Sequence, residues 1–294
     1  MTDSIGFIGL GIMGRPMARH LVDAGFPLAV HSRSPGPVDE LVANGAQARM
    51  SPAEVAAGTD VVITMLPDTP DVELVLFGEN GVGSRLRPGS LVVDMSTIDP
   101  LATRRFAESL REMGAGMVDA PVSGGEKGAV EGTLSIMVGG SENDVSRAMP
   151  LLRAMGTTIV HVGDSGAGQV AKACNQLVVA STIQAVAEAL ALAERAGVDP
   201  RRVREALLGG FAGSKILEIH GQRMLDRTFT PGFRSRLHLK DARIVLDTAA
   251  RVDSAVPAFE VTADALRRLV DGGGGELDHS ALFTLLEQVT PDHG

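Results

Sequence analysis

Short apolar runs alternate with amphipathic stretches through the first half of the chain. Seven such runs cover residues 5–9, 28–30, 61–66, 91–94, 117–119, 134–138 and 158–162. Between the first two runs, Met13, Met17 and Leu21 recur every four residues and Gly25 follows, which predicts an amphipathic helix that stops at this glycine. The sequence Ser-Pro-Ala-Glu at 51–54 combines a capping box with an early proline and predicts another helix start. This alternation predicts a parallel sheet covered by helices.

The pattern changes after Gly163. Residues 166–196 are rich in Ala, Leu, Val and Gln and contain no proline, which predicts one helix of roughly 45 Å that links two halves of the protein. A further helix start follows at Asp199-Pro200, and apolar positions with helical spacing recur near 203–208, 237–250 and 256–270. The glycines at 272–275 predict a flexible surface joint. We therefore expect a sheet-containing domain over residues 1–164 and an all-helical domain over residues 165–294.

Composition narrows the kind of protein. A chain of 294 residues with 44% hydrophobic content suits two domains. The net charge of −9 argues against nucleic acid as a partner. No secretory signal opens the sequence and polar residues or glycine interrupt every apolar run, so we expect neither export nor a membrane span. The single cysteine, Cys174, excludes an internal disulfide, fits a cytoplasmic location and is expected to be a small buried side chain.

A glycine pattern at the end of the first predicted strand points to a nucleotide cofactor. Gly9, Gly11 and Gly14 stand in the spacing Gly-x-Gly-x-x-Gly, between that strand and the first helix. Gly9 would permit a tight turn, Gly11 would let a pyrophosphate approach the backbone, and Gly14 would let the helix pack on the strand. The sequence therefore predicts a Rossmann domain whose loop, with Leu10, Ile12 and Met13, binds a dinucleotide.

The end of the second predicted strand indicates which dinucleotide is used. NAD-binding domains usually carry Asp or Glu there, to accept a hydrogen bond from the ribose 2′-hydroxyl. This chain has Ser32, Arg33 and Ser34 instead. The guanidinium of Arg33 and the two hydroxyls suit a 2′-phosphate, so NADP(H) is preferred and NAD(H) remains possible.

Three segments together resemble the β-hydroxyacid dehydrogenase family: Gly-Phe-Ile-Gly-Leu-Gly-Ile-Met-Gly at 6–14, Asp-Ala-Pro-Val-Ser-Gly-Gly at 119–125 and Gly-Gln-Val-Ala-Lys-Ala-Cys-Asn at 168–175. The likeness runs from about residue 5 to residue 286. It implies an N-terminal Rossmann domain, an all-α C-terminal domain and an active site in a cleft between them. The family includes 3-hydroxyisobutyrate dehydrogenases, tartronate semialdehyde (2-hydroxy-3-oxopropionate) reductases and related short-chain semialdehyde reductases.

Within the family, three shorter segments at 209–214, 238–241 and 278–282 resemble the tartronate semialdehyde reductases most. This likeness implies reduction of tartronate semialdehyde, or a similar short carboxylated aldehyde, to the hydroxyacid. The Ser-Arg-Ser segment at 32–34 departs from the 3-hydroxyisobutyrate enzymes, which usually carry an acidic residue there.

Reduction of an aldehyde needs a proton donor at the developing alkoxide as well as a hydride donor. Lys172 resembles the family's catalytic lysine and is expected to be the general acid. Helical spacing places Lys172, Asn175 and Gln176 on one face with Gly168. We expect Gly168 to leave room for substrate or cofactor and Asn175 to orient the substrate or the lysine.

The resemblance also assigns the remaining site residues. Ser123, Gly124 and Gly125 suit a substrate carboxylate beyond a strand end. Lys240 resembles the family lysine that closes over cofactor and substrate. Leu66-Pro67 and Ser96-Thr97 follow two further strands and are expected to line the nicotinamide and ribose path. Phe211 and Ser214 either shape the substrate pocket or belong to a helix C-terminus.

No metal is expected, because His161, His220, His238 and His279 show no close metal-ligand spacing and the family resemblance implies no metal. The apolar long helix predicts burial against a second subunit, and the family implies a homodimer or homotetramer. Three alternatives stay open: oxidation of 3-hydroxyisobutyrate, imine reduction, against which Lys172 argues, and a dinucleotide-binding sensor without catalysis.

Overall fold

The computed structural model describes residues 3–287. It forms two compact units, Met1–Lys172 and Ala173–Gly294. The division falls inside the long helix, whereas the sequence pattern places the boundary at its start, after residue 164. Each unit is described here by itself.

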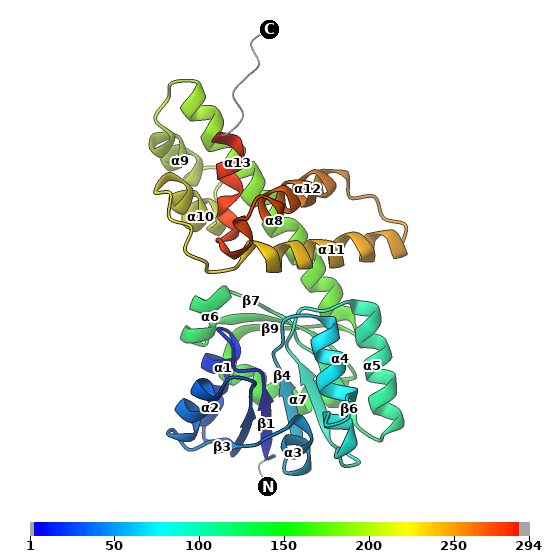
Figure 1. The fold of residues 1–294 in the computed structure, drawn as a ribbon. Coiled ribbons are helices and arrows are strands. Elements are labelled where there is room, and N and C mark those ends of the chain that lie inside the picture. Colours follow the sequence, from blue (N-terminus) through cyan, green and yellow to red (C-terminus); the bar gives the residue numbers. More distant parts are fainter. Residues whose placement is uncertain (1–2, 288–294) are drawn as a thin grey trace. The chain divides into compact units, whose positions relative to one another are not determined.

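The N-terminal unit alternates strands and helices from its first element onward (Figure 1). Its strands are β1 (Ile5–Ile8), β2 (Leu28–His31), β3 (Gln47–Ala48), β4 (Val61–Thr64), β5 (Leu91–Asp94), β6 (Gly116–Asp119), β7 (Val122–Ser123), β8 (Leu134–Gly139) and β9 (Gly156–Gly163). Its helices are α1 (Gly14–Asp23), α2 (Pro35–Val42), α3 (Pro52–Ala57), α4 (Thr69–Phe77), α5 (Pro100–Glu112), α6 (Gly125–Glu131) and α7 (Glu142–Met155), with a 3-10 turn, η1 (Val82–Ser84). All seven predicted strands are present, and the two-residue strands β3 and β7 were not predicted.

Six strands form a parallel sheet in the order β3-β2-β1-β4-β5-β6, which is the order typical of dinucleotide-binding domains. The expectation of a wholly parallel sheet is wrong beyond β6. β8 runs antiparallel to β6 and to β7, and these two short strands pair one after the other along β8. β9 lies parallel to β8. Residue pattern does not encode strand direction, because an apolar strand covered on both faces looks the same either way.

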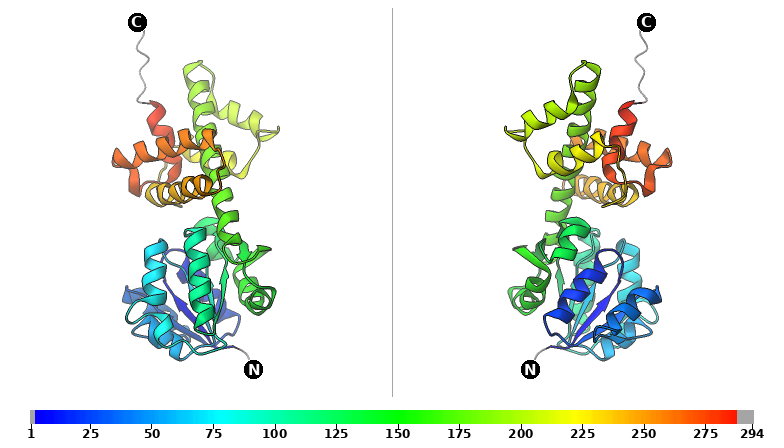
Figure 2. Two further views of the ribbon diagram at one scale, coloured as in Figure 1. Left: turned by 90° about the vertical axis from the view of Figure 1, so that its right-hand side faces the viewer. Right: turned by 90° about the vertical axis from the view of Figure 1, so that its left-hand side faces the viewer.

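Helices cover both faces of this sheet (Figures 1 and 2). Ile5 and Phe7 belong to the core cluster under α1, α2 and α7, whereas Ile8 belongs to the cluster under α3, α4 and α5. The strands β4 and β5 divide in the same way, because successive side chains of a strand point to opposite faces. Burial on both faces explains why these strands are apolar throughout rather than alternating.

Local signals set the helix ends as predicted. Gly25 adopts φ +83° after α1, a left-handed conformation that glycine reaches without strain. The Ser51 hydroxyl accepts the N–H of Glu54, whose carboxylate accepts the N–H of Met50. These bonds satisfy donors that the first turn of α3 would otherwise leave unpaired.

The long helix is α8 (Ala167–Arg195), within one residue of its predicted bounds at each end. By length and composition alone it would also pass as a membrane-crossing helix, although polar residues interrupt its apolar run as the sequence predicts. In the C-terminal unit, however, Ala180, Ile183, Ala187 and Leu190 are fully buried in the core. A core helix of this kind passes the same test of length and composition, so the helix is weak evidence for a span.

The C-terminal unit contains helices and no strand among its described residues 173–287. Besides α8 these are α9 (Pro200–Leu208), α10 (Lys215–Leu225), α11 (Ser235–Arg251), α12 (Pro257–Asp271) and α13 (Phe283–Glu287), with 3-10 turns η2 (Gly274–Glu276) and η3 (His279–Leu282). The helices α10 and α13 were not predicted. Within the glycine run at 272–275, Gly272 and Gly273 lie at the surface as expected, but Gly274 is buried, and a Cβ there would lie 2.6 Å from the Leu269 side chain.

Candidate active site

The carboxyl ends of the parallel strands bring the predicted cofactor segments to one edge of the sheet. Ile8 pairs in register with His31 on one side and Thr64 on the other, and Thr64 pairs with Asp94. The segments 9–14, 32–34, 66–67 and 96–97 each follow one of these strand ends. Because β1 lies between β2 and β4, the chain reverses its winding direction at β1, which is where open sheets of this kind bind ligands.

The glycine loop has the geometry that the spacing predicts. Gly9 adopts φ +100°, and a Cβ on Gly14 would lie 1.9 Å from the carbonyl oxygen of Gly9. These two glycines are therefore required by the turn and by the close packing of α1. A Cβ on Gly11 would meet no atom within 4 Å, so protein packing does not require glycine there. That open backbone fits close approach of a pyrophosphate.

The other loop residues divide between core and surface. The Leu10 side chain is buried in the core and leaves only its backbone for a ligand, whereas Ile12 is exposed. At the end of β2, Arg33 and Ser34 are exposed. Ser34 is the N-cap residue of α2, but its side chain makes no capping bond and the first turn contains no acidic residue. The hydroxyl of Ser34 is thus not used in capping, which suits contact with a phosphate.

A buried hydrogen-bond network fixes the loops after β4 and β5. The carboxylate oxygen Oδ1 of Asp94 accepts the Thr64 hydroxyl at 2.8 Å and the Ser96 N–H at 3.2 Å. The Ser96 hydroxyl oxygen then accepts the N–H of Leu66 at 2.9 Å. Burial raises the pKa of Asp94 to about 6, against which the bonds from Ser96 and Thr64 act. Oδ2 of Asp94 is buried and has no hydrogen-bond partner. Sequence analysis missed this carboxylate.

Asp119, at the end of β6, holds the start of α8. Its two carboxylate oxygens accept the backbone N–H groups of Gly166 at 2.7 Å and Gln169 at 2.9 Å. Burial raises the pKa of Asp119, and these backbone donors lower it in part. The expectation that Gly168 leaves room for a ligand is wrong. A Cβ there would lie 2.5 Å from the carbonyl oxygen of Met137 and 2.7 Å from that of Asp119, so this glycine lets α8 pack on the sheet.

Lys172 follows one turn later and is only 7% exposed, which is rare for a lysine. It is the last residue of the N-terminal unit, the unit that also holds the glycine loop. Cys174, two residues on, is exposed, so its assignment as a small buried side chain is wrong.

In the C-terminal unit, a chain of polar contacts joins two predicted site residues. Asn175 Nδ2 donates to Gln176 Oε1 at 2.8 Å, and Gln176 Nε2 donates to Asp241 Oδ2 at 2.5 Å. Asp241 Oδ1 lies 2.7 Å from Lys240 Nζ. Gln176 and Asp241 are both buried. Sequence analysis did not identify these two residues as the connection between α8 and α11.

Ser123 and Gly124 lie where the ladder of β7 on β8 ends, and Gly125 begins α6. Gly124 and Gly125 are exposed and have φ values of +134° and +61°, which glycine adopts without strain. The placement beyond a strand end agrees with the prediction.

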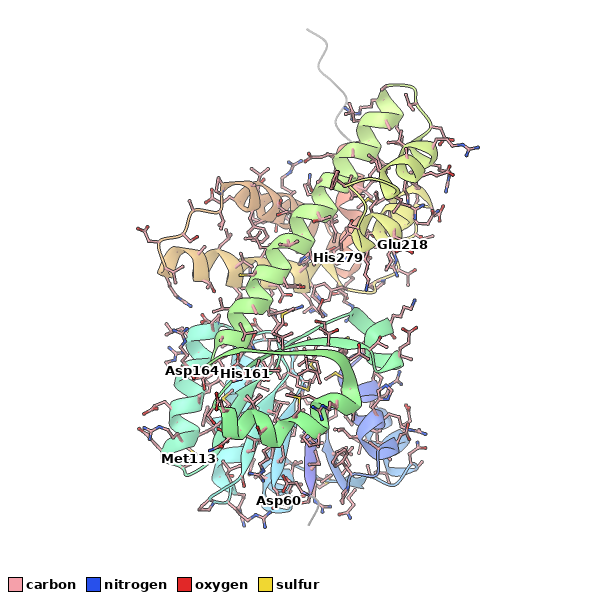
Figure 3. The ribbon with its side chains drawn as sticks, turned by 180° about the vertical axis from the view of Figure 1, so that it is seen from behind. Asp60, Met113, His161, Asp164, Glu218 and His279 are labelled. Carbon is pink, nitrogen blue, oxygen red and sulfur yellow. The ribbon has the colours of Figure 1, made fainter. Side chains whose placement is uncertain are left out.

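Three of the histidines lie close together in the C-terminal unit, where Figure 3 labels His279. His279 Nδ1 lies 2.9 Å from His238 Nδ1, and its Nε2 lies 3.3 Å from His220 Nε2. Burial, and next the neighbouring His238, lower the pKa of His279 well below its ordinary value. His220, Asp278 and His279 could each offer a ligand atom to a metal, although their sequence positions do not suggest it.

Other contacts already occupy the carboxylate of this set. Asp278 accepts the N–H groups of Gly232 and Phe233 and both donors of Ser280, and it pairs with Arg223 at 2.9 Å. Burial raises the pKa of Asp278, but the hydrogen bonds from His220 and Ser280 outweigh burial and hold the pKa well below its ordinary value. Asp278 therefore stabilises the local structure by binding the 232–233 backbone, Arg223 and Ser280. The absence of a metal stays a prediction.

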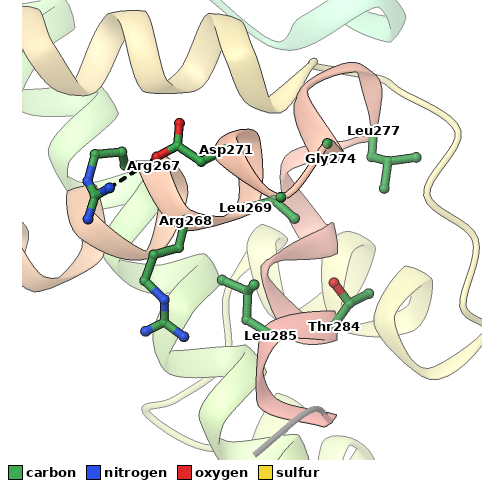
Figure 4. Close-up of a pocket in the computed structure, with 10 residues that line it drawn as sticks. Arg267, Arg268, Leu269, Asp271, Gly274, Leu277, Thr284 and Leu285 are labelled. Carbon is green, nitrogen blue, oxygen red and sulfur yellow. Dashed lines mark hydrogen bonds and ion pairs between the residues drawn. The ribbon is translucent and has the colours of Figure 1, made fainter.

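A depression in the C-terminal unit (Figure 4) is lined by residues of α12, the glycine turn and α13. Arg267 on its rim pairs with Asp264 and Asp271, and no predicted site residue lines it. Phe211 is fully exposed after α9, and Ser214 caps α10 by accepting the N–H of Leu217. Ser214 therefore lies at the start of a helix, and the alternative that it belongs to a helix C-terminus is wrong.

Comparison with known proteins agrees with this arrangement. Residues 4–163 match the family model described as the NAD binding domain of 6-phosphogluconate dehydrogenase. Residues 166–286 match the model described as NAD-binding of NADP-dependent 3-hydroxyisobutyrate dehydrogenase. The chain belongs to the 3-hydroxyisobutyrate dehydrogenase-like family. It is an NAD(P)-dependent β-hydroxyacid dehydrogenase, as the sequence predicted.

Individual relatives place it within this family. The chain is 50% identical to the 2-hydroxy-3-oxopropionate reductase of Escherichia coli, over 96% of this chain and 97% of the relative. It is 38% identical to a probable mitochondrial 3-hydroxyisobutyrate dehydrogenase of Dictyostelium discoideum, over 98% and 92%. The structure of 3-hydroxyisobutyrate dehydrogenase with L-serine from Mycobacterium tuberculosis matches with a TM-score of 0.88 and 34% identity, over 97% and 99%.

Proposed function

We propose that this family member reduces 2-hydroxy-3-oxopropionate, or a similar short carboxylated aldehyde, to the hydroxyacid with NADP(H) as the preferred cofactor. The observation that carries the proposal is the burial of Lys172 in the unit that holds the dinucleotide loop. The substrate is suggested by the 50% identity to the 2-hydroxy-3-oxopropionate reductase.

Each residue has a defined task in this proposal. NADPH supplies the hydride when bound. Lys172 donates the proton to the oxyanion that forms at the aldehyde carbon, and its positive charge stabilises that oxyanion. Asn175 orients the substrate or the lysine. Ser123, Gly124 and Gly125 bind the carboxylate through a hydroxyl and backbone N–H groups.

The cofactor residues are assigned by their position at the sheet edge. Residues 9–14 bind the pyrophosphate. Leu66-Pro67 and Thr97 contact the nicotinamide ribose, and Lys240 of the helical unit contacts both cofactor and substrate. Arg33, with Ser32 and Ser34, binds the 2′-phosphate. Charge-assisted hydrogen bonds of this kind contribute about 1.5–3 kcal/mol each.

The domain limits 1–164 and 165–294, a cytoplasmic location and a homodimer or homotetramer complete the proposal. Exposed apolar residues on α8, among them Val178 and Leu192, are consistent with burial against a second subunit. Light scattering of the purified protein measures its oligomeric state directly.

The test is a set of initial rates with NADPH and with NADH, using 2-hydroxy-3-oxopropionate, glyoxylate, succinic semialdehyde and methylmalonate semialdehyde. We expect the highest kcat/KM for 2-hydroxy-3-oxopropionate with NADPH. Arg33→Ala should raise KM for NADPH about 10-fold or more and leave KM for NADH nearly unchanged. Equal losses with both cofactors would contradict the phosphate assignment.

A second candidate is 3-hydroxyisobutyrate oxidation, because the chain is also similar to enzymes with that name. It would replace the first if methylmalonate semialdehyde with NADH gave the highest kcat/KM.

A further inference from the structure

Gln169 is a buried polar residue that has no role in the proposed reaction as described above. Its side chain is on the first turn of α8, and the residue is only 1% exposed. Its Nε2 donates to the carbonyl oxygen of Ser96 at 2.8 Å, and its Oε1 accepts the N–H of Ile98 at 3.1 Å. Both ends of one amide therefore bind the backbone of one loop, on either side of Thr97.

This loop is also tied to its neighbour at the sheet edge. The Ser96 hydroxyl oxygen accepts the N–H of Leu66, so Gln169 connects α8 with both segments that are assigned to the nicotinamide ribose. On the helix side, Lys172 lies three residues after Gln169, and side chains three residues apart are neighbours on a helix surface, about 5–6 Å apart. The contact thus joins the cofactor loops to the turn that carries the proposed acid.

We propose that Gln169 is a positioning residue that holds the 96–98 loop at a fixed distance from the helical turn of Lys172, so that proton donor and hydride donor are aligned on one substrate. The inference rests on the proposed function. An amide is suited to this task because it donates at one end and accepts at the other without charge. A carboxylate could not donate to the Ser96 carbonyl oxygen, and it would add a charge close to the buried acids Asp94 and Asp119.

The first experiment replaces Gln169 with methionine, which keeps the length of the side chain and removes both hydrogen bonds. Active-site misplacement by about 1 Å can cost about 100-fold in rate. We expect kcat per folded molecule to fall about 10-fold to 100-fold, while the Kd for NADPH rises much less. Hydrogen exchange of the Ile98 amide, measured without cofactor, should become faster because its acceptor is lost.

The matched control is Gln184→Met on the same helix. The Gln184 amide donates to Glu188 and has no contact with a cofactor loop in the described residues. We expect wild-type kcat and wild-type exchange at Ile98. A fall in kcat equal to that of Gln169→Met would mean that loss of any such amide perturbs the helix, and would overturn the inference.

The second variant, Gln169→Glu, tests the need for a donor and an acceptor together. A protonated Glu side chain can make both bonds, whereas the ionised form can make only one. Burial raises the pKa of a carboxyl group, so kcat of this variant should recover as the pH falls, relative to Gln169→Met at the same pH. A residue with a purely structural role would lower the melting temperature of both variants and leave the pH profile of kcat unchanged.

The outcomes separate the two proposals. A wild-type protein without reductase activity overturns both. An active wild-type protein together with wild-type kcat in Gln169→Met overturns only the positioning role. If Gln169→Met does not fold, the pH profile of Gln169→Glu decides, and a profile parallel to that of the wild type rejects the inference.

Discussion

The two units organise their candidate functional residues in different ways. In the N-terminal unit these residues follow consecutive strands, and the sheet register alone brings the segments together at one edge. In the C-terminal unit, the side chains of Gln176 and Asp241 connect Asn175 with Lys240. Backbone topology thus brings together the candidate residues of the N-terminal unit, whereas side-chain packing between distant helices connects those of the C-terminal unit.

The comparison also extends to buried acids. Asp94 in the N-terminal unit has a raised pKa because it is buried with one oxygen unsatisfied. Asp278 in the C-terminal unit is buried as well, but its many donors hold its pKa below the ordinary value. Burial alone does not decide whether a carboxyl group is ionised. Hydrogen bonds to the ionised form outweigh the effect of burial at Asp278, but they do not at Asp94.

The largest expected effect is that of Lys172→Ala, which tests the residue where the two units meet along the chain. General acids typically contribute 10²–10⁴-fold to rate, so kcat should fall by about 1,000-fold. Binding of NADPH, measured by fluorescence, should remain because the glycine loop is untouched. If the protein were a dinucleotide-binding sensor without catalysis, the wild type would show no turnover, and Lys172→Ala would leave the response to cofactor unchanged.

Lys127→Ala is the control for this variant, because Lys127 is an exposed lysine of the N-terminal unit. We expect its kcat to equal that of the wild type. An equal loss in both variants would remove the support for Lys172 as the acid.

The next effect concerns pH and distinguishes the two buried acids. The pKa of Asp94 is raised from 3.8 to about 6, so its protonated form stabilises the fold below pH 4, and this stability is lost as the pH rises through 6. Relative to Asp94→Asn, the wild type should lose about 2.4 kcal/mol of unfolding free energy between pH 4 and pH 7. Urea unfolding of both proteins at these pH values measures the difference.

Asp278 should behave in the opposite way. Its lowered pKa means that its contribution is present above pH 4 and disappears at more acidic pH. If Asp278→Asn, compared with the wild type, showed the same pH dependence as Asp94→Asn, the contrast between the two units would be wrong.

A smaller effect is expected for the side-chain network of the helical unit. Asp241→Asn removes the charge that faces Lys240 at 2.7 Å. Hydrogen bonds to charged groups contribute about 1.5–3 kcal/mol, so unfolding free energy should fall by about 2 kcal/mol. The rate should also fall if Lys240 must be held in place, while the Kd for NADP(H) at the glycine loop changes little. Unfolding free energy and kcat that both match the wild type would show that the network has no such role.

The smallest effect should be the same in both units. Ser51 and Ser214 each cap a helix through one hydrogen bond to a backbone N–H. Replacement of either by alanine should cost about 1 kcal/mol of unfolding free energy. Ser214→Ala should keep the wild-type kcat/KM for every aldehyde. A specific change in kcat/KM for one aldehyde would restore Ser214 as a pocket residue.

Interactions between residues close together in the chain explain which features could be predicted from the sequence. Helix starts at Ser51 and Asp199 follow from single side chains that accept backbone N–H groups within three residues. The glycine loop follows from steric limits within six residues. Lys172 is proposed as the general acid because its neighbours resemble a family motif, since helical periodicity alone does not distinguish it from a solvated lysine.

The amino-acid sequence by itself determined the family, the order of strands and helices in the N-terminal unit, the helical character of the C-terminal unit and the dinucleotide loop, because each depends on contacts between residues near in the chain. Only the tertiary structure decided the reversed direction of β8, the packing role of Gly168, the exposure of Cys174 and the partners of Asp94, Gln169 and Asp241. Asp94 and Thr64 are 30 residues apart in the chain, Gln176 and Asp241 are 65 apart, and Gln169 and Ser96 are 73 apart. No local pattern specifies which distant backbone or side chain a buried polar group will meet.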